Sequence, residues 1–555
     1  MTGAVPMTAM DGPVAAAVSR TMVWSTAAGY ARLRVADPGR WRAVAHAWRH
    51  WAARAGRLAA RLGADLVRLG AAWSGAAASA AAARLTAVRR GLVLFRVLCW
   101  QADQAASEFA AALTRAKESL ARALAAAHRR GLTVDDEGVV RGSPAAPGVA
   151  DDLRAAVAIA SAADETAAER LERIEAAVRR LAGPAWLPGS AASARSGLPD
   201  CTASPTEVRL WWAGLDPAER LWLLATEPSR LAPLDGIPAA DRDAANRLLL
   251  DERREQVEQA LAQAHGGERP RLRSLRHGLD TLADRLADDD GPRAYLLRLD
   301  LSEEGRVVVA LGDPDRAGHV VTHVPGMTAE LASFGGELSR AERVAVRATE
   351  LSPAASTSAV LWLDYDAPDF VDEAASARRA EAGAPALRRF QEGLRATADA
   401  TPGAPPGGSP ARLTVVGHSY GSLVVGKAAA GSGLAADNVV FVGSPGVGVD
   451  SVRDLATPPG RVWSTTSSSD IIQYATPGPA ALARDLAISR LVPVLGPAIA
   501  FGSPERDLWF GHNPSDPSFG ARTFASAPGA GHLGYWDRGS PSLDMLAAIT
   551  LGTAR

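Results

Sequence analysis

Seven short runs, all but the first containing β-branched residues, lie between Tyr295 and Thr466, separated by stretches of helical character. The runs are YLLRLDL (295–301), RVVVAL (306–311), HVVTHVPG (319–326), SAVLWLDYD (358–366), RLTVVGHS (412–419), NVVFVGSPG (438–446) and RVWSTT (461–466). Several are continuously apolar, as strands buried on both faces of a parallel sheet must be. Strands that alternate with helices favour an α/β fold. We therefore predict a doubly wound, mostly parallel sheet in this part of the chain.

The preceding region has a helical composition. Residues from about 20 to 131 are rich in Ala, Arg and Leu and contain few helix breakers. Two amphipathic runs flank Trp73-Ser74-Gly75: RLAARLGADLVRLGAAW before it and LTAVRRGLVLFRVLCWQADQAASEFAAALTRAKESLARALAAAH after it. Because glycine permits a tight turn, we predict an antiparallel helical hairpin whose corner is closed by the Trp73 indole.

This hairpin resembles the WXG100 family of small helical-hairpin proteins linked to type VII secretion. The tyrosine followed four residues on by an acidic residue, the usual companion export signal, does not follow the second helix. A generic helical bundle with a core tryptophan is the alternative interpretation. A helical protein partner, bound through the apolar stripe of this region, is a further expectation.

A chain of 555 residues is too long for one ordinary core, so we expect several domains. The predicted organisation begins with a flexible N-terminus (1–19) and a WXG100-like helical domain (20–132). A helix and a linker rich in Gly, Pro, Ala and Ser occupy 133–204. The α/β domain spans 205–555, with a helical, cap-like lead-in over 205–292 and the core over 293–555.

The distribution of charge and the number of cysteines indicate which classes of binding site to expect. Residues 1–133 carry 19 Lys and Arg against six Asp and Glu, while the whole chain has a formal net charge of −1. The basic region suits docking on the acidic remainder or on an acidic partner. Nucleic-acid binding is not predicted, because the arginines are spread along the helices and no nucleic-acid motif is found. The two cysteines, Cys99 and Cys201, exclude a disulfide framework and a cysteine-built zinc site.

Localisation is predicted from the absence of two signals. The N-terminal residues lack a basic start followed by a strong apolar run. The most apolar segment, LVPVLGPAIAFG (491–502), is too short to span a bilayer. We expect no transmembrane segment and a protein that is cytoplasmic, or exported without a Sec signal peptide.

The motif Gly417-His418-Ser419-Tyr420-Gly421 lies between a predicted strand, LTVVG, and a predicted helix, YGSLVVGKAAAG. That is the context of a nucleophile elbow, in which the serine occupies a strained turn and the strand nearly touches the helix. Gly417 and Gly421 remove the side chains that would block this approach. We therefore predict that Ser419 is a nucleophile. A tight strand-to-helix turn without chemistry is the alternative.

A nucleophilic serine requires a base and an orienting carboxylate, which in this fold follow in the order Ser, Asp or Glu, His. His532 precedes a predicted final helix and is favoured as the base over His512, which lies in a loop rich in Pro, Gly and Asp. Asp470 follows the RVWSTT strand and is favoured as the acid. Asp450, one strand earlier, remains the alternative.

The oxyanion of an acyl-transfer intermediate needs two N–H donors. We predict the backbone N–H groups of Tyr420, at the start of the helix, and Met327, in the loop after the third strand. Gly326 allows that loop to turn toward the site. A Pro-Gly turn that only feeds a helix would contain the same residues.

Seven segments together resemble the DUF1023 alpha/beta hydrolases of actinobacteria over about residues 205–550: LDGIPAADRDAANRLLL, HVVTHVPGM, LWLDYDAPD, LTVVGHSYGSLVVGKAA, VVFVGSPGVGVD, FGHNPSDPSFGARTF and GHLGYW. The resemblance implies that Ser419 is the nucleophile, Asp470 the acid and His532 the base. The acid segment, SSSDIIQY, departs from the more usual Asp-Pro form. Members of the family often carry a WXG100-like region in front.

The predicted function is that of a serine hydrolase, of the carboxylic ester hydrolase type, that cleaves a small-molecule ester or thioester without a metal or an organic cofactor. The apolar segment 478–510 suggests a lid or an acyl-chain wall, and thus a lipid-like substrate, although ordinary packing explains it equally well. Two alternatives remain. One is a secretion-linked binding or effector scaffold with little or no hydrolase activity, and the other is an amidase or peptidase with the same triad.

Overall fold

The structure is a computed structural model that describes residues 26–142, 147–182, 197–288, 291–398, 410–474 and 507–555. The chain forms two compact units, which we describe separately. Unit 1 comprises Met1–Gly197 and Leu215–Thr226, and unit 2 comprises Leu198–Gly214 and Glu227–Arg555. The predicted N-terminal segment 1–19, residues 183–196 of the predicted helix-and-linker region 133–204, and nearly all of the segment 478–510 lie outside the described residues.

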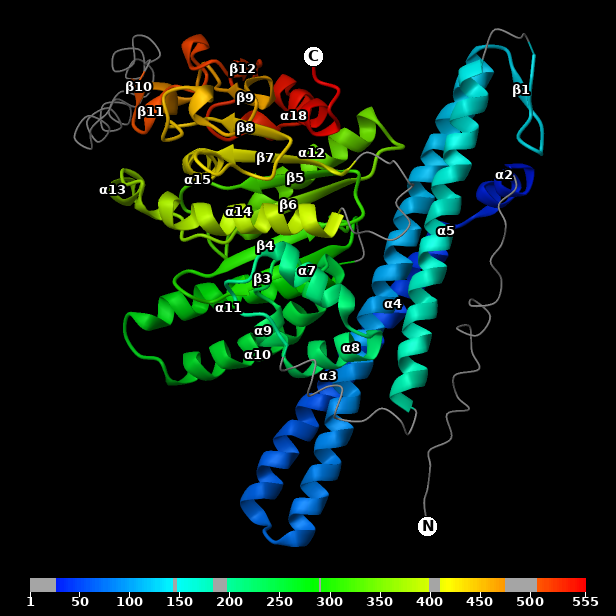
Figure 1. The fold of residues 1–555 in the computed structure, drawn as a ribbon, viewed down its shortest axis with the longest axis vertical. Helices are drawn as coiled ribbons and strands as arrows, with labels where there is room; N and C mark the ends of the chain where they lie inside the picture. Colours follow the sequence, from blue (N-terminus) through cyan, green and yellow to red (C-terminus); the bar gives the residue numbers. More distant parts are fainter. Residues whose placement is uncertain (1–25, 143–146, 183–196, 289–290, 399–409, 475–506) are drawn as a thin grey trace. The chain divides into compact units, whose positions relative to one another are not determined.

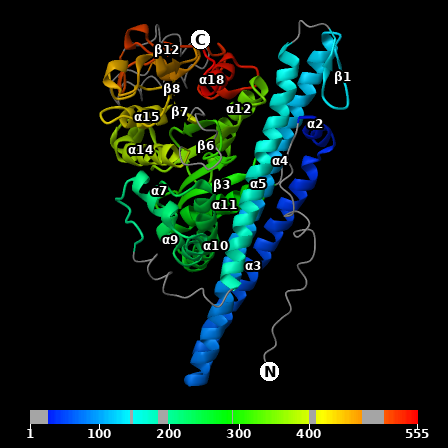
Figure 2. The same cartoon turned by 45° about the vertical axis from the view of Figure 1, so that its right-hand side comes forward.

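Unit 1 is helical (Figures 1 and 2). Its elements are α2 (Thr26–Val35), α3 (Pro38–Ala72), α4 (Ala76–Arg129), β1 (Thr133–Val134), β2 (Val140–Arg141), α5 (Pro147–Ala182) and α8 (Pro217–Thr226). Helix α3 begins at Pro38, and the Asp37 side chain caps it by accepting from the Gly39 N–H at 2.8 Å. The core lies where α2 and α5 pack on the C-terminal half of α4, with Leu33, Leu113 and Leu153 among its buried residues.

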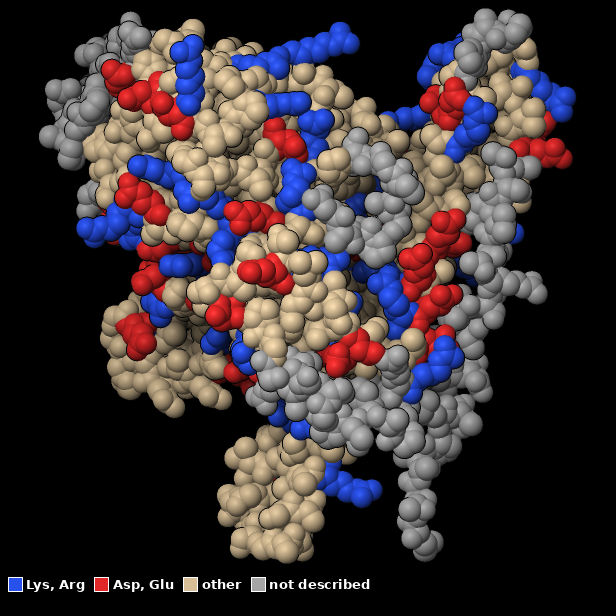
Figure 3. Space-filling view, in the orientation of Figure 1, with Lys and Arg blue, Asp and Glu red and all other residues tan. Residues whose placement is uncertain are grey.

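The α3–α4 hairpin turns at the predicted corner. Helix α3 ends at Ala72, α4 begins at Ala76, and Gly75 adopts a φ of +104° that favours glycine. The prediction that the Trp73 indole closes the corner is wrong, because Trp73 is 46% exposed. The residues around it are alanine, serine and glycine, which are too small to enclose an indole. Figure 3 shows the tip of the hairpin as a surface that is almost free of charged side chains.

Unit 2 is built on an eight-stranded sheet with the order β12-β9-β8-β7-β5-β6-β4-β3. Its strands are β3 (Ala294–Asp300), β4 (Arg306–Leu311), β5 (His319–Val324), β6 (Thr357–Leu363), β7 (Arg412–His418), β8 (Asn438–Val442), β9 (Val462–Thr465) and β12 (Arg522–Thr523). The β3–β4 and β4–β6 pairs are antiparallel, and the other pairs are parallel. The predicted doubly wound, mostly parallel sheet is confirmed.

Helices cover both faces of this sheet (Figure 1). The helices of unit 2 are α7 (Pro205–Gly214), α9 (Pro228–Leu231), α10 (Ala239–Gln263), α11 (Glu268–Ala287), α12 (Phe334–Leu351), α13 (Val371–Ala374), α14 (Arg378–Ala398), α15 (Tyr420–Ala429) and α18 (Pro541–Leu551). Helix α12 packs on α18, while α14 packs on α15. The central strands are buried on both sides, which explains why their sequences are continuously apolar.

Short elements complete the C-terminal part of unit 2. They are the 3-10 turns η2 (Val452–Asp454), η3 (Pro459–Arg461), η4 (Ile471–Tyr474), η5 (Pro517–Phe519) and η6 (Gly534–Trp536), and the two-residue strands β10 (Asp507–Leu508) and β11 (Gly511–His512). The turns η4 and η6 follow β9 and β12 along the chain. They therefore lie beyond the carboxyl ends of parallel strands, where open α/β sheets place their ligands.

Candidate active site

Ser419 lies between β7 and α15 in a backbone conformation that side-chain-bearing residues rarely adopt. Its φ is 52° and its ψ is −129°, and it is one of three described non-glycine residues with a positive φ. The Ser419 N–H donates to the carbonyl of Val442 on β8 at 3.0 Å, which ties the turn to the neighbouring strand. Strain of this kind persists only where the surroundings impose it.

The flanking glycines are required by close backbone contacts. A Cβ on Gly417 would lie 2.6 Å from the Cα of Ser422. A Cβ on Gly421 would lie 2.3 Å from the Val324 carbonyl oxygen and 2.4 Å from that of Pro325. Real Cβ atoms do not approach backbone this closely, so β5, β7 and α15 can meet only around glycine. The structure therefore has the steric features expected of a nucleophile elbow.

The loop after β5 passes directly beside Ser419. A Cβ on Gly326 would lie 2.7 Å from the Ser419 Cβ and 3.2 Å from its Oγ. The buried hydroxyl of Tyr365 holds this loop by donating to the Pro325 carbonyl at 2.7 Å. Within the described part of the chain, the N–H of Met327 donates to no backbone group. The N–H of Met327, which follows the residue in contact with Ser419, is therefore available as a hydrogen-bond donor.

Asp470 and His532 form a hydrogen-bonded pair. Asp470 follows β9 and is fully buried, and its two carboxylate oxygens lie 3.0 and 2.9 Å from Nδ1 of His532. The Tyr535 hydroxyl donates to Oδ2 of Asp470 at 2.6 Å and accepts from the Ser467 N–H at 2.9 Å. Because the carboxylate binds Nδ1, the neutral imidazole carries its proton there and leaves Nε2 as an acceptor. Among the described residues, Nε2 of His532 has no hydrogen-bond partner, Ser419 included.

Gly443 connects this pair with the serine. It directly follows Val442, which accepts the Ser419 N–H, and it has a φ of +54°. A Cβ here would lie 2.8 Å from Oδ2 of Asp470 and 3.3 Å from Nδ1 of His532. The three residues predicted from the sequence are therefore gathered at the carboxyl ends of β7, β8 and β9.

A buried layer of aromatic and imidazole rings supports the loop of His532. Nε2–H of His418 donates to the His532 carbonyl at 2.9 Å, and the two rings lie 4.8 Å apart. The Trp536 ring packs edge-on against both His418, at 5.0 Å, and His323, at 5.3 Å. Burial, and next the electrostatic interaction with the His532 imidazole, lowers the pKa of His418 well below its usual value, so His418 is neutral.

Glu337 of α12 anchors the far side of this layer. Its Oε2 lies 2.9 Å from Nε2 of the buried His323. Burial raises the pKa of Glu337, but the hydrogen bond and charge of His323 and the charge of Arg340 outweigh burial and lower that pKa to about 2. Glu337 is therefore ionised at neutral pH.

His512, the alternative base, and Asp450, the alternative acid, have other hydrogen-bond partners. His512 is buried between Asp507, which is 2.9 Å from its Nδ1, and Ser518, which is 2.7 Å from its Nε2. Asp450 accepts the backbone N–H of His512 at 3.2 Å. The structure pairs Asp450 with the loop of His512, and it pairs Asp470 with His532.

The sequence interpretation did not single out Gly443, Tyr535 or the ring of His418. Each stood in a segment quoted for another reason: Gly443 ends a strand, and Tyr535 follows His532 by three residues. The positive φ of Gly443 is imposed by its neighbours in space, and the hydrogen bond from Tyr535 to Asp470 joins residues 65 positions apart. Neither feature can be predicted from a local pattern. The sequence contained one local signal for these residues. Gly443 comes at the end of a predicted buried strand that follows the predicted elbow strand in the chain.

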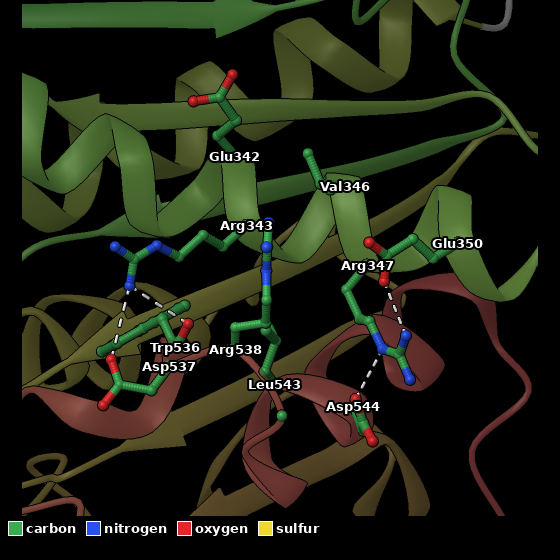
Figure 4. A pocket seen from close by; sticks show the side chains of 11 residues that line it. Glu342, Arg343, Val346, Arg347, Glu350, Trp536, Asp537, Arg538, Leu543 and Asp544 are labelled. Atoms are coloured by element: carbon green, nitrogen blue, oxygen red, sulfur yellow. Dashed lines mark hydrogen bonds and ion pairs between the residues drawn. The ribbon is translucent and has the colours of Figure 1, made fainter.

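A separate pocket of about 860 Å³ lies between α12 and the η6–α18 segment (Figure 4). Its charged side chains are largely paired: Arg343 donates to the Trp536 carbonyl at 3.4 Å, and Arg347 bonds Asp544 at 2.7 Å. None of Ser419, Asp470 or His532 lines it. Trp536 belongs both to this wall and to the layer around His418, and the pocket is distinct from the candidate site.

Comparison with known proteins identifies the family to which the chain belongs. A family model described as alpha/beta hydrolase matches residues 300–480, a range that contains β4 to β9, Ser419 and Asp470. The uncharacterized proteins Mb0988c of Mycobacterium bovis and Rv0963c of Mycobacterium tuberculosis are each 31% identical over 216 residues, which cover 37% of this chain and 74% of theirs. The chain belongs to this alpha/beta hydrolase family.

A longer relative extends the likeness. The uncharacterized protein Rv2079 of Mycobacterium tuberculosis is 29% identical over 400 residues, which cover 64% of this chain and 56% of the relative. The chain thus spans a little over half the length of that relative. No solved structure matches the chain. The resemblances to DUF1023 proteins and to WXG100 proteins stay predictions.

The described residues contain neither a membrane-spanning helix nor a metal-binding cluster. No described helix is both long enough and apolar enough to cross a bilayer. The same residues contain no cluster of three or more His, Cys, Asp or Glu side chains arranged to hold a metal ion.

Proposed function

We propose that the protein is a serine hydrolase in which Ser419, His532 and Asp470 form the catalytic triad. Nε2 of His532 takes the proton of the Ser419 hydroxyl while Oγ attacks an acyl carbonyl. Asp470 fixes the imidazole through Nδ1 and stabilises its positive charge. Protonated His532 then gives its proton to the leaving group, and an acyl-enzyme ester on Ser419 remains. Water, deprotonated by His532, releases the acid and restores the serine.

The backbone N–H groups of Tyr420 and Met327 are the proposed oxyanion donors. Tyr420 is the first residue of α15, where the N–H groups lack intrahelical acceptors and the helix dipole favours negative charge. Met327 lies beside Gly326, which contacts Ser419. The two donors thus flank the serine on the helix side and on the loop side. Preorganised donors of this kind stabilise the tetrahedral intermediate as its charge develops.

One observation carries the proposal: the strained backbone of Ser419 is tied to β8 immediately before Gly443, which contacts both Asp470 and His532. A turn with no chemistry has no reason to hold a serine at positive φ beside a buried His–Asp pair. Strain and buried charge both cost stability, and they are retained together at active sites.

The substrate class follows from apolar side chains around the triad. Three exposed hydrophobic residues are either a proposed site residue or next in sequence to one: Met327, Ile471 and Leu533. Met327 follows Gly326, Ile471 follows Asp470, and Leu533 follows His532. An acyl chain would cover such surface on binding and gain about 25 cal/mol per Å² of apolar area removed from water. We propose esters or thioesters with an apolar acyl group as substrates.

A series of p-nitrophenyl esters from acetate to dodecanoate tests this function on the full chain. We expect turnover by wild type to rise with acyl length, and Ser419→Ala to lose about 10⁴-fold in kcat. The structure offers matched controls: Asp470→Asn and His532→Gln should abolish turnover, whereas Asp450→Asn and His512→Gln should retain it.

The outcomes separate the parts of the proposal. Turnover retained in Ser419→Ala would refute the triad. Comparable kcat/KM for an ester and an amide of the same acyl group would leave the triad intact and replace the ester assignment by amide hydrolysis. If wild type hydrolyses no ester and no amide, the proposed hydrolase function is refuted and a binding scaffold is favoured.

A further inference from the structure

The tip of the α3–α4 hairpin is unusual for a protein surface because it carries no charge. Residues 69–83, LGAAWSGAAASAAAA, contain no Asp, Glu, Lys, Arg or His. The residues from Ala71 to Ala77 are all exposed, with Trp73 at the apex. Val67 is 75% exposed and Val88 is 53% exposed on the adjoining turns of the two helices. Water therefore meets an apolar surface that spans both helix ends.

The charge that flanks this tip is almost entirely positive, with Asp65, which pairs with Arg68 at 3.3 Å, as the exception. Residues 38–96 contain eleven arginines and one acidic residue, Asp65. Arg68 and Arg84 bound the uncharged run on either side, and both are exposed. In Figure 3 no Asp or Glu is visible on the hairpin tip. A docking partner for this surface must combine apolar character with negative charge.

We propose that the tip of this hairpin binds the surface of a membrane that contains anionic lipids, with residues 69–83 entering the interface. An apolar apex flanked by arginines matches the layered chemistry of a bilayer, in which acyl chains lie beneath anionic headgroups. Tryptophan is enriched at this boundary, because its ring is apolar and its N–H is polar. Membrane association of this kind is peripheral, in keeping with the lack of a spanning helix among the described residues.

Co-sedimentation of the full chain with vesicles tests the proposal. One vesicle is pure phosphatidylcholine, and the other contains 30% phosphatidylglycerol. We expect binding to the anionic vesicle only, weakening as NaCl rises because exposed charges are screened. Trp73→Ser should weaken binding about tenfold through the lost apolar contact. The double variant Arg68→Glu, Arg84→Glu should weaken it at least about 30-fold, because each arginine near an anionic surface contributes roughly fivefold.

A matched control makes the same change of charge on another helix. Arg154 and Arg179 of α5 are both exposed, and each pairs with an acidic residue on its own helix. The double variant Arg154→Glu, Arg179→Glu should bind vesicles within about twofold of wild type. Circular dichroism should show unchanged helix content in every variant, since only exposed positions are altered.

Three results would overturn the proposal. The first is equal sedimentation with neutral and anionic vesicles, or none with either. The second is wild-type binding by both tip variants, or an equal loss in the α5 control. The third is tip-dependent binding to duplex DNA without binding to the anionic vesicle, which would assign the hairpin to nucleic acid instead.

Discussion

The hydroxyl of Tyr535 gives a quantitative test of the buried acid. Tyr535 is fully buried and links Asp470 to the backbone of Ser467. Tyr535→Phe removes one hydrogen bond to a carboxylate, which contributes about 1.5–3 kcal/mol, and one between neutral groups, which contributes about 1 kcal/mol. We expect the free energy of unfolding to fall by about 3 kcal/mol, because the Ser467 N–H and a lone pair of Asp470 are left buried without this partner.

Urea denaturation measures this loss, and ester hydrolysis measures its effect on the site. With one support of Asp470 removed, His532 is held less firmly, so kcat should fall about 10- to 100-fold while KM changes little. Tyr295→Phe is the control: Tyr295 is equally buried, and its hydroxyl has no hydrogen-bond partner within the described residues. A Tyr535→Phe protein as stable and as active as Tyr295→Phe would refute the reasoning.

Two further perturbations test the surroundings of the serine. Gly326→Ala places a Cβ 2.7 Å from that of Ser419, so kcat should fall about 100-fold, whereas Gly335→Ala, which meets nothing within 4 Å, should retain activity. The pKa of Glu337 is lowered from 4.5 to about 2. Its contribution to the free energy of unfolding is therefore complete above pH 4.5 and is lost as the pH falls toward 2. Across that window the free energy of unfolding should fall by about 3 kcal/mol more in wild type than in Glu337→Gln, whose amide no longer titrates beside His323. Equal acid-titration curves for wild type and Glu337→Gln, or a wild-type kcat in Gly326→Ala, would contradict these assignments.

The sequence predicted the central sheet because burial on both faces leaves a local trace. The apolar runs around Val415 and Val440 correspond to strands whose residues are buried on either side. The strained serine was also predictable, since Gly417 and Gly421 flank it between a strand and a helix. In these cases the determining contacts lie within a few residues or repeat with a regular period.

Other features depend on segments that are distant in the chain. Tyr535 bonds Asp470 across 65 residues, and no local pattern marks a tyrosine for that role. The sequence favoured Asp470 over Asp450 as the acid, but the hydrogen bonds of Asp470 to His532 and of Asp450 to the His512 N–H join segments 62 residues apart and could be found only from the fold. Trp73 was assigned to a closed corner by its position, whereas its exposure reflects the small residues that surround it in space.

Mass spectrometry of the full chain after reaction with a fluorophosphonate tests the central claim most directly. The account predicts one covalent adduct per chain, located on Ser419, that is lost in Ser419→Ala and greatly slowed in His532→Gln. Ser419→Ala differs by a single oxygen at a partly exposed position, so its urea denaturation curve should match that of wild type. An adduct on any other serine, or undiminished labelling of a folded Ser419→Ala protein, would contradict the account.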